Sequence, residues 1–410
     1  MTRISRRTIG GLLVVFVLFL TYALSQFPPS ATAQPMDGKA IFRMDTFGDE
    51  QLWTDFLRMH EAIDDVDPKT ALSVGLKVDV EALPSELIAA LRAKDVDLSS
   101  PALTIELLRL NAVVGVKGNV NSSGRLTSIG ITCALCHSTV DDSLVPGIGK
   151  RLDGWANTDL NVGAIVALSP APEIDDALKA ELNTWGPGKY DPRHHAFDGT
   201  NLRILHEGSK SLPVVIPPIY GLKNVGFETY TGDGPISYWN NYVGVSQMGG
   251  QGNFNDDRIG VFIEQSPDLV TPKLGALFDY QVGLHTPKPP EGSFNRQAAN
   301  RGRQLFQKQA RCASCHSDPT TYTDVLSSPH ATVPVLHEPT EIGTEPVYAT
   351  RSATGKYRAT PLRALWQHAP YFHDGSAADL PAVVEHYNTQ FGLNLSAAQK
   401  ADLVEFLKSL

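Results

Sequence analysis

Two cysteine pairs, each followed directly by a histidine, are the residues whose types and spacing most clearly serve chemistry. They are Cys133, Cys136 and His137, and then Cys312, Cys315 and His316, which together use all four cysteines of the chain. Two thiols one helical turn apart can add to the two vinyl groups of haem, and the adjacent histidine then lies beneath the iron as a ligand. The spacing predicts two covalently attached haem c groups. A zinc site or a thiol redox pair is the alternative, but the repeated complete motif favours haem.

The N-terminus predicts export from the cytoplasm. Three arginines precede an apolar stretch from Ile9 to about Leu24, and Ala31-Thr32-Ala33 forms a small-residue cleavage site. The stretch is shorter than the roughly 20 residues that a membrane-spanning helix needs. We therefore expect a signal peptide over residues 1–33, a periplasmic location, and no stable membrane anchor after cleavage.

Charge and length restrict the partners and the number of domains. The formal charge of -9 becomes -12 when the three arginines of the leader are removed, since -9 - 3 = -12. An acidic surface disfavours nucleic acid and steers a basic protein toward it. We expect a periplasmic redox protein as electron donor or acceptor, and no nucleic-acid partner. The 377 remaining residues (410 - 33) exceed what one core usually carries, so two domains are expected.

The separation of the motifs indicates how the domains are arranged. Their first cysteines are 179 residues apart (312 - 133), which suits one haem per domain rather than a tandem array. The proline-rich stretch 286–293 reads as a linker. We predict an N-terminal haem domain over residues 34–290 and a C-terminal cytochrome c domain over residues 291–410.

The apolar patterns predict a mainly α fold with two cytochrome c-like haem domains. Helical periodicity leads into the second motif over 298–310, and Ser396 with Gln399 forms a capping box before a closing helix. An added helical segment precedes the first motif over 34–124, with patterns at 51–63, 84–93 and 104–113. Residues 183–260 are rich in glycine, proline and aromatics, and are expected to be mostly loop.

The sixth ligand of each iron decides between electron transfer and chemistry on a bound ligand. No methionine follows Cys312, so the second haem has the candidates His330, His337, His368, His373, His386 and Tyr387. Met248 is the only methionine between the motifs. Either it ligates the first iron, or it is core filler and that iron is open on one side.

The C-terminal sequence resembles the bacterial di-haem cytochrome c peroxidase and MauG superfamily. The match rests on residues 359–376, which contain Thr-Pro-Leu-Arg and Pro-Tyr-Phe-His-Asp-Gly, and on residues 380–388. It is good over about 298–410, partial over 125–265 and absent over 36–124, so the chain is expected to be a divergent member. The resemblance implies a haem-based, peroxidase-like oxidoreductase. Peroxide or oxygen would bind at the N-terminal haem, and electrons would pass through the C-terminal haem.

The same resemblance implies roles for single residues. Tyr387 falls where the family has the sixth ligand of the C-terminal haem, with His386 as the alternative. Trp239 is the counterpart of a tryptophan that relays electrons between the haems, although a buried core position is the competing interpretation. A calcium ion between the domains is a further cofactor of the family, with carbonyl ligands that fall at His368 and Pro370.

Three departures from the family pattern favour a second hypothesis. No histidine follows the first motif closely. Gln247 stands where the family has a glutamate that works as acid and base, and an amide cannot shuttle a proton. The asparagine of the calcium site is not found near Pro217 and Pro218. The alternative function is therefore a non-enzymatic periplasmic electron-transfer cytochrome in which both haems are six-coordinate and Met248 fills the first.

Overall fold

The computed structural model describes residues 36–206, 208–318, 320–327 and 332–410. The predicted signal peptide and His330 lie outside the described residues. Asp37–Leu410 form one compact unit, and the domain boundary near residue 290 stays a prediction. Within the described ranges, no helix is both long and apolar enough to cross a membrane.

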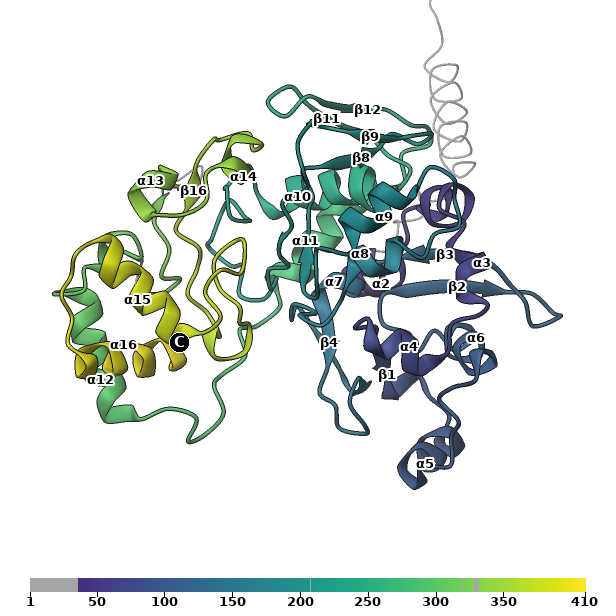
Figure 1. The fold of residues 1–410 in the computed structure, drawn as a ribbon, viewed down its shortest axis with the longest axis horizontal. Helices are drawn as coiled ribbons and strands as arrows, with labels where there is room; N and C mark the ends of the chain where they lie inside the picture. The colour runs from purple at the N-terminus through teal and green to yellow at the C-terminus, as the bar shows by residue number, and fades with distance from the viewer. Residues whose placement is uncertain (1–35, 207, 319, 328–331) are drawn as a thin grey trace, which may run out of the picture. The chain divides into compact units, whose positions relative to one another are not determined.

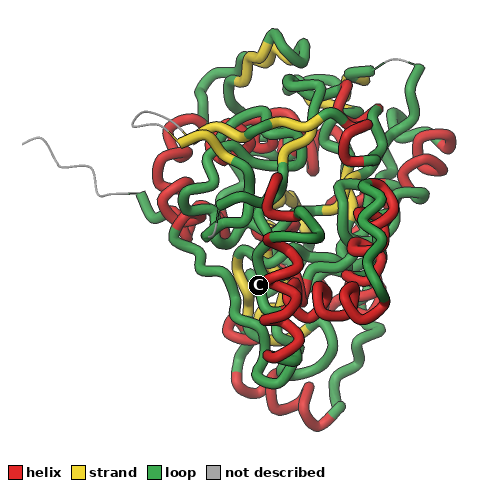
Figure 2. Tube along the Cα trace, turned by 90° about the vertical axis from the view of Figure 1, so that its left-hand side faces the viewer, coloured by secondary structure: helices red, strands yellow, loops and turns green. Residues whose placement is uncertain are grey.

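Helices are the main regular structure, and strands are short. Every sheet in the described part of the chain has two strands, which the short yellow segments of Figure 2 show. A mainly α fold class is therefore confirmed. The irregular connections between the helices and hairpins are long, as the composition of the middle of the chain predicts.

The segment before the first motif, residues 36–124, is mainly helical and contains two short strands, β1 (Val78–Asp79) and β2, that were not predicted. Its helices are α2 (Gly38–Met44), η1 (Gln51–Phe56), α3 (Met59–Ile63), α4 (Pro68–Ser73), η2 (Val80–Ala82), α5 (Ser85–Ala93) and α6 (Pro101–Arg109). The expectation of helix throughout 34–124 is wrong at β2 (Val116–Val120), which pairs antiparallel with β3 (Leu126–Ile131). Branched residues favour strands, and Gly124 at φ +81° turns the chain between the two.

This segment packs directly on the first haem motif. Strand β3 runs into Cys133, and α7 (Ala134–His137) carries the rest of the motif. A Cβ atom on Gly115 would lie 2.0 Å from the backbone nitrogen of Leu135, so only glycine lets the two backbones approach this closely. The carboxylate of Asp49 accepts a hydrogen bond from the backbone of Ile131 at 3.1 Å. The added segment is thus part of the wall around the first motif.

The region between the motifs consists of hairpins and short helices. Its strands are β4 (Ser138–Val140), β5 (Ile148–Gly149, paired with β1), β6 (Arg151–Asp153), β7 (Lys189–Tyr190), β8 (His195–Phe197), β9 (Leu202–Ile204), β10 (Val214–Val215), β11 (Phe254–Asp256) and β12 (Val261–Ile263). Its helices are α8 (Val162–Val166), α9 (Asp176–Leu182), α10 (Ile236–Tyr242), η3 (Val243–Gln247), η4 (Thr271–Lys273) and α11 (Leu274–Val282). Helix α10 lies in the stretch predicted to be mostly loop. Its buried Ile236, Trp239 and Tyr242 recur every third residue, a helical period that the surrounding glycines and prolines obscure.

The C-terminal region closes around a pair of crossed helices. Its elements are α12 (Arg296–Gln307), η5 (Cys312–Ser314), β13 (Val325–Ser327), β14 (Thr332–Pro334), β15 (Leu336–His337), α13 (Pro339–Ile342), α14 (Val347–Thr350), β16 (Tyr357–Arg358), η6 (Leu365–Gln367), α15 (Leu380–Gln390) and α16 (Ala397–Lys408). The predicted helices before the second motif and at the end of the chain are confirmed as α12 and α16. The capping box of Ser396 and Gln399 is present at the start of α16.

Helices α12 and α16 lie side by side, beside α15 (Figure 1). A Cβ atom at Gly302 would lie 2.0 Å from the carbonyl oxygen of Asp402, so glycine permits the close crossing. The aromatic rings of Phe306 and Phe406 meet edge to face at 5.2 Å, and both side chains are fully or nearly fully buried. This contact forms the centre of the apolar core beside the second haem motif.

Replacing Phe406 with alanine is expected to lower the free energy of unfolding by about 3–5 kcal/mol, because a fully buried ring is lost and a cavity remains. Urea unfolding followed by circular dichroism measures the change. Phe262→Ala is the matched control, since that ring on β12 is 55% exposed and its loss should change stability by roughly 0.5 kcal/mol or less. Equal effects of the two substitutions would contradict the packing described for α12 and α16.

Candidate haem-binding sites

The two motif histidines are held in the same way, each by a backbone carbonyl. His137 Nδ1 lies 3.0 Å from the carbonyl oxygen of Pro217, and His316 Nδ1 lies 2.6 Å from that of Tyr322. A carbonyl only accepts hydrogen bonds, so Nδ1 donates and Nε2 keeps its lone pair. Burial lowers the pKa of His137 to about 4 and also lowers that of His316, against the opposing effect of these carbonyls. Both rings are therefore neutral imidazoles with Nε2 available to a metal.

Three of the motif thiols, those of Cys133, Cys136 and Cys312, are protonated. Burial raises the pKa of Cys133 and of Cys136 to about 12, and that of Cys312 to about 11. None of the four cysteines forms a disulfide. Reactive redox thiols have a lowered pKa, so the thiol redox alternative fits these residues poorly.

The second motif faces a largely apolar cavity of about 280 Å³. Its two cysteines and His316 line the cavity, and Tyr387 of α15 lines it as well. Apolar side chains from three helices complete the walls: Phe306 of α12, Val383 and Val384 of α15, and Leu403 and Leu407 of α16. Residues of the preceding half also contribute, among them Pro217 and Tyr220. Such walls suit a porphyrin ring.

Four charged residues also line this cavity: Arg311, which is exposed, and three that lie together. Arg358 and Glu228 form a buried ion pair with a separation of 3.2 Å, and Arg363 lies close enough to influence the same carboxyl. Arg363 Nη1 is buried and has no hydrogen-bond partner among the described residues. Two guanidinium groups against one carboxylate leave a surplus of positive charge, and a buried donor without an acceptor is costly.

Haem c fits these residues. Two thiols and a neutral imidazole lie together at the second motif, the walls are apolar, and the free guanidinium nitrogen of Arg363 suits a propionate carboxylate. The first motif presents the same donor set of two thiols and an imidazole with a free Nε2. The resident group would thus be held by Cys133, Cys136 and His137 in one site and by Cys312, Cys315 and His316 in the other.

The side chains of Tyr387 and His386 lie in different environments. Tyr387 lines the cavity, and burial raises its pKa, with smaller contributions from the thiols of Cys312 and Cys315. His386 Nε2 instead bonds the carbonyl oxygen of Ile342 at 2.9 Å, and His386 is not among the cavity-lining residues. The arrangement favours Tyr387 over His386, and its role as sixth ligand stays a prediction.

The remaining histidine candidates of the described part also reach the cavity. His337, His368 and His373 line it. His373 is already engaged, since its Nε2 lies 3.1 Å from the hydroxyl of Tyr357. Burial lowers the pKa of His368, whose ring lies 5.5 Å from that of Tyr371.

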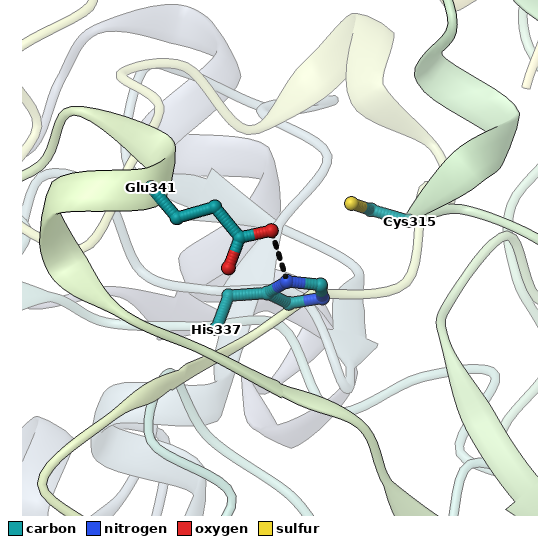
Figure 3. Close-up of side chains that lie close together, drawn as sticks. All are labelled: Cys315, His337 and Glu341. Atoms are coloured by element: carbon teal, nitrogen blue, oxygen red, sulfur yellow. Dashed lines mark hydrogen bonds and ion pairs between the residues drawn. The ribbon is translucent and has the colours of Figure 1, made fainter.

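His337 also belongs to a group of three possible metal-binding side chains (Figure 3). The carboxylate of Glu341 points at the His337 ring, 3.1 Å from Nδ1, and the sulfur of Cys315 lies near the same ring. One donor atom of each residue lies within 4.8 Å of the others. The interaction with Cys315 is the first cause that raises the pKa of His337 to about 9, and Glu341 adds to it, whereas burial opposes the rise. Haem attachment and a metal ion here exclude each other, because both need the sulfur of Cys315.

Gln247 forms a saturated hydrogen-bond network. Its Oε1 accepts from the hydroxyl of Tyr190 at 2.7 Å, and its Nε2 donates to the carbonyl of His195 at 2.9 Å and to Ser246 Oγ at 3.0 Å. Burial raises the pKa of Tyr190, and the Cys136 thiol is one of the smaller contributors. The Gln247–Tyr190 pair therefore lies near the first motif.

Met248 and Trp239 both lie in the apolar core. Met248 is 5% exposed and belongs to a buried apolar cluster that also contains Phe47. Cys133 packs against this cluster. The ring of Trp239 lies beneath the guanidinium of Arg193, 5.0 Å from its carbon. Neither side chain lines the second cavity. The roles of Met248 as ligand and of Trp239 as relay stay predictions.

The two residues whose carbonyls are proposed for calcium, His368 and Pro370, both line the second cavity. A calcium site stays a prediction.

Sequence reasoning missed the polar residues that support the motifs. Arg363 is the final residue of the Thr-Pro-Leu-Arg block, which is the one signal that could have identified it. Glu228, Arg358 and Tyr190 stand in no motif. They are brought to the sites only by folding.

Comparisons with known proteins find two curated peroxidases. The chain is 28% identical over 173 residues to the cytochrome-c peroxidase IdrP2 of Pseudomonas sp. (strain SCT), a match that covers 33% of this chain and 47% of that protein. Part of the chain is thus similar to a cytochrome-c peroxidase. IdrP2 of Denitromonas iodatirespirans is 29% identical over 151 residues, which cover 29% of this chain and 41% of that protein. The match thus spans about half the length of these curated peroxidases.

Solved structures and family models add little to the peroxidase relationship. No protein-family model matches the chain. A MauG-like protein associated with microbial copper homeostasis is 21% identical with a TM-score of 0.35, covering 54% of this chain and 85% of its own. Hydrazine synthase of Kuenenia stuttgartiensis is 18% identical with a TM-score of 0.30, covering 53% and 76%. Superpositions at these scores do not bear on the fold.

Glu228→Gln is expected to change how stability depends on pH. Burial raises the pKa of Glu228 from 4.5 to about 7, although Arg358 and Arg363 oppose the shift. The folded protein then binds this proton more tightly than the unfolded chain, so stability falls as pH rises from about 4.5 to about 7, by roughly 3 kcal/mol in total. Urea unfolding across this range should show a shallower decline in the variant. An unchanged slope would contradict the burial of Glu228, and Glu291→Gln, an exposed position, is the control.

Proposed function

We propose that this chain is an exported di-haem c-type cytochrome and a haem-based oxidoreductase of the cytochrome c peroxidase and MauG type. Peroxide or oxygen would react at the N-terminal haem, and a periplasmic redox protein would supply electrons through the C-terminal haem. The observation that carries the proposal is the matched support of the two motif histidines, each neutral, buried and held through Nδ1 by a backbone carbonyl.

The residues of the two sites would divide the work. Bound haem supplies an iron that accepts and donates single electrons. His137 and His316 would hold the iron through Nε2, and their carbonyl partners keep the rings from turning. Tyr387 would fill the sixth position at the C-terminal site, making that site an electron store. The apolar walls of the second cavity exclude water from it.

Export and partner choice belong to the same proposal. Haem-attaching motifs, an N-terminus with the features of a signal peptide, and a formal charge of -12 after its removal together support a periplasmic protein that meets a basic redox partner. The two haems would be the cofactors.

A specific observation favours the alternative, a non-enzymatic electron-transfer cytochrome. Gln247 replaces the acid-base glutamate, and both ends of its amide are engaged with Tyr190 and with the His195 carbonyl. An amide held in this way can orient a ligand but cannot deliver a proton to it. In this alternative, Met248 would close the first iron, and both irons would be six-coordinate.

Electron paramagnetic resonance and absorption spectra of the purified ferric protein separate the two functions. The peroxidase-like function predicts one high-spin and one low-spin haem, and a change of the Soret band when peroxide is added. Two low-spin haems that do not respond to peroxide would overturn it in favour of the electron carrier. Absence of covalently bound haem would overturn both.

Tyr387→Phe is expected to convert the C-terminal haem from low spin to high spin and to raise its reduction potential. The reason is that an anionic oxygen ligand stabilises the ferric iron, and phenylalanine cannot supply it. Redox titration with paramagnetic resonance detection measures both effects. Tyr371→Phe is the matched control, because this cavity-lining tyrosine donates its hydroxyl to the Leu365 carbonyl. An unchanged spin state in Tyr387→Phe would exclude this residue as the ligand.

A further inference from the structure

Two tryptophans far apart in the sequence meet between the haem motifs. The rings of Trp155 and Trp366 contact each other edge to face, with centroids 5.8 Å apart and planes at 82°. Trp155 follows β6, in the half that carries the first motif, and Trp366 lies in η6, in the half that carries the second. Edge-to-face contact is a favourable geometry for aromatic pairs, and it places the two π systems in direct contact.

Trp155 is fixed to the first haem motif on both sides. The backbone nitrogen of Gly154 donates to the carbonyl of His137 at 2.8 Å, and that of Asn157 donates to the carbonyl of Cys136 at 2.9 Å. The indole is therefore carried on a short segment that is hydrogen-bonded to the proximal histidine and to an attachment cysteine.

Trp366 is fixed to the wall of the second cavity. Its neighbour Leu365 and the nearby His368 both line that cavity. The side chain of Gln367 donates to the hydroxyl of Tyr220, which also lines the cavity. The Tyr220 ring lies edge-on to Trp155 at 6.4 Å. Trp155, Tyr220 and Trp366 thus form one aromatic group. It is connected to the segment that is hydrogen-bonded to the first motif and to the wall of the second cavity.

A second connection runs beside the indoles. The Pro217 carbonyl accepts from His137 Nδ1, and Pro217 itself lines the second cavity. The backbone nitrogen of Ile219 donates to the carbonyl of Gly154 at 2.9 Å. Residues 217–220 therefore join the Trp155 segment, the first histidine and the second cavity in one packed unit.

Trp239 lacks these connections. Its neighbours Arg193, Tyr238 and Tyr242 do not line the second cavity, whereas Tyr220, the ring neighbour of Trp155, does. Electron tunnelling weakens with the length of the path and is less weakened through packed and bonded atoms than through gaps. Trp155 and Trp366, which are connected to both haem sites, are thus better placed than Trp239 for electron transfer between them.

We propose that Trp155 and Trp366 form the electron relay between the two haem sites, in place of Trp239. The relay rests on the proposed function in needing two haems, but it does not need peroxide. One electron leaves the C-terminal haem, which is oxidised, and reaches the N-terminal haem, which is reduced. The two indoles are unchanged at the end, and no proton is transferred.

The test measures electron transfer within the full-length, haem-loaded protein after a flash-photolysed flavin injects one electron. Trp155→Phe and Trp366→Phe should each slow the transfer between the haems severalfold, while the two reduction potentials and the haem spectra stay as in the wild type. Trp185→Phe is the control, because this buried indole bonds Ser211 and packs on Tyr190, and neither of these partners lines the cavity. Trp239→Phe is measured in parallel.

Each result decides the proposal. Slower transfer in the Trp155 and Trp366 variants, with Trp239→Phe and Trp185→Phe at the wild-type rate, supports it. Wild-type rates in both relay variants, slowing in Trp239→Phe alone, or no internal transfer in the wild type overturns it. If a phenylalanine variant does not fold, Trp155→Tyr and Trp366→Tyr retain a hydrogen-bonding aromatic and are judged by the same rates. If electron transfer slows as expected in the Trp155 and Trp366 variants but the wild-type protein does not react with peroxide, the relay is supported and the peroxidase-like function is refuted.

Discussion

The hydrogen bond from each motif histidine to a backbone carbonyl is the interaction on which both sites depend. It fixes which ring nitrogen carries the proton, and therefore which nitrogen is free for a metal. The two carbonyls come from different distances along the chain. Tyr322 lies six residues after His316, whereas Pro217 lies 80 residues after His137. The support of the second histidine can therefore form locally, but that of the first requires that a distant segment be in place.

Burial is the second constraint, and it acts on every polar group of the sites. It raises the pKa of Cys133, Cys136, Cys312 and Tyr387 and lowers that of the two motif histidines, so these groups are neutral before any ligand is present. The exception is the Arg358, Arg363 and Glu228 group, where two cations share one carboxylate. A surplus cation in an apolar cavity is stable only with a further anion, which is the chemistry that a haem propionate offers.

The segment Val215–Tyr220 connects these two constraints. It supplies the carbonyl for the first histidine and several residues of the wall of the second cavity. The backbone nitrogen of Val215 donates to the carbonyl of His373 at 2.7 Å, and Lys189 reaches the carbonyl of Asp374 at 2.8 Å. Because these bonds cross from one half of the chain to the other, neither site is independent of the other half.

The sequence by itself determined the chemistry of attachment and the ends of the best helices. The order Cys-x-x-Cys-His places two thiols and an imidazole on one turn whatever surrounds them, and a capping box such as Ser396 with Gln399 acts within four residues. These are local features, so α12 and α16 and the haem motifs could be read directly. The strand β2 and the helix α10 could not, because each depends on a partner or a core that the local composition does not reveal.

Only the tertiary structure decided which residues surround the motifs. His386 and Tyr387 are neighbours in the sequence, yet one bonds the Ile342 carbonyl and the other lines the cavity. Trp155 and Trp366 stand in unrelated stretches, yet their rings are in contact. The physical reason is that the orientation of a side chain on a helix and the contact of distant segments are set by packing against the rest of the protein. Residue type and spacing describe only what lies within a few positions along the chain.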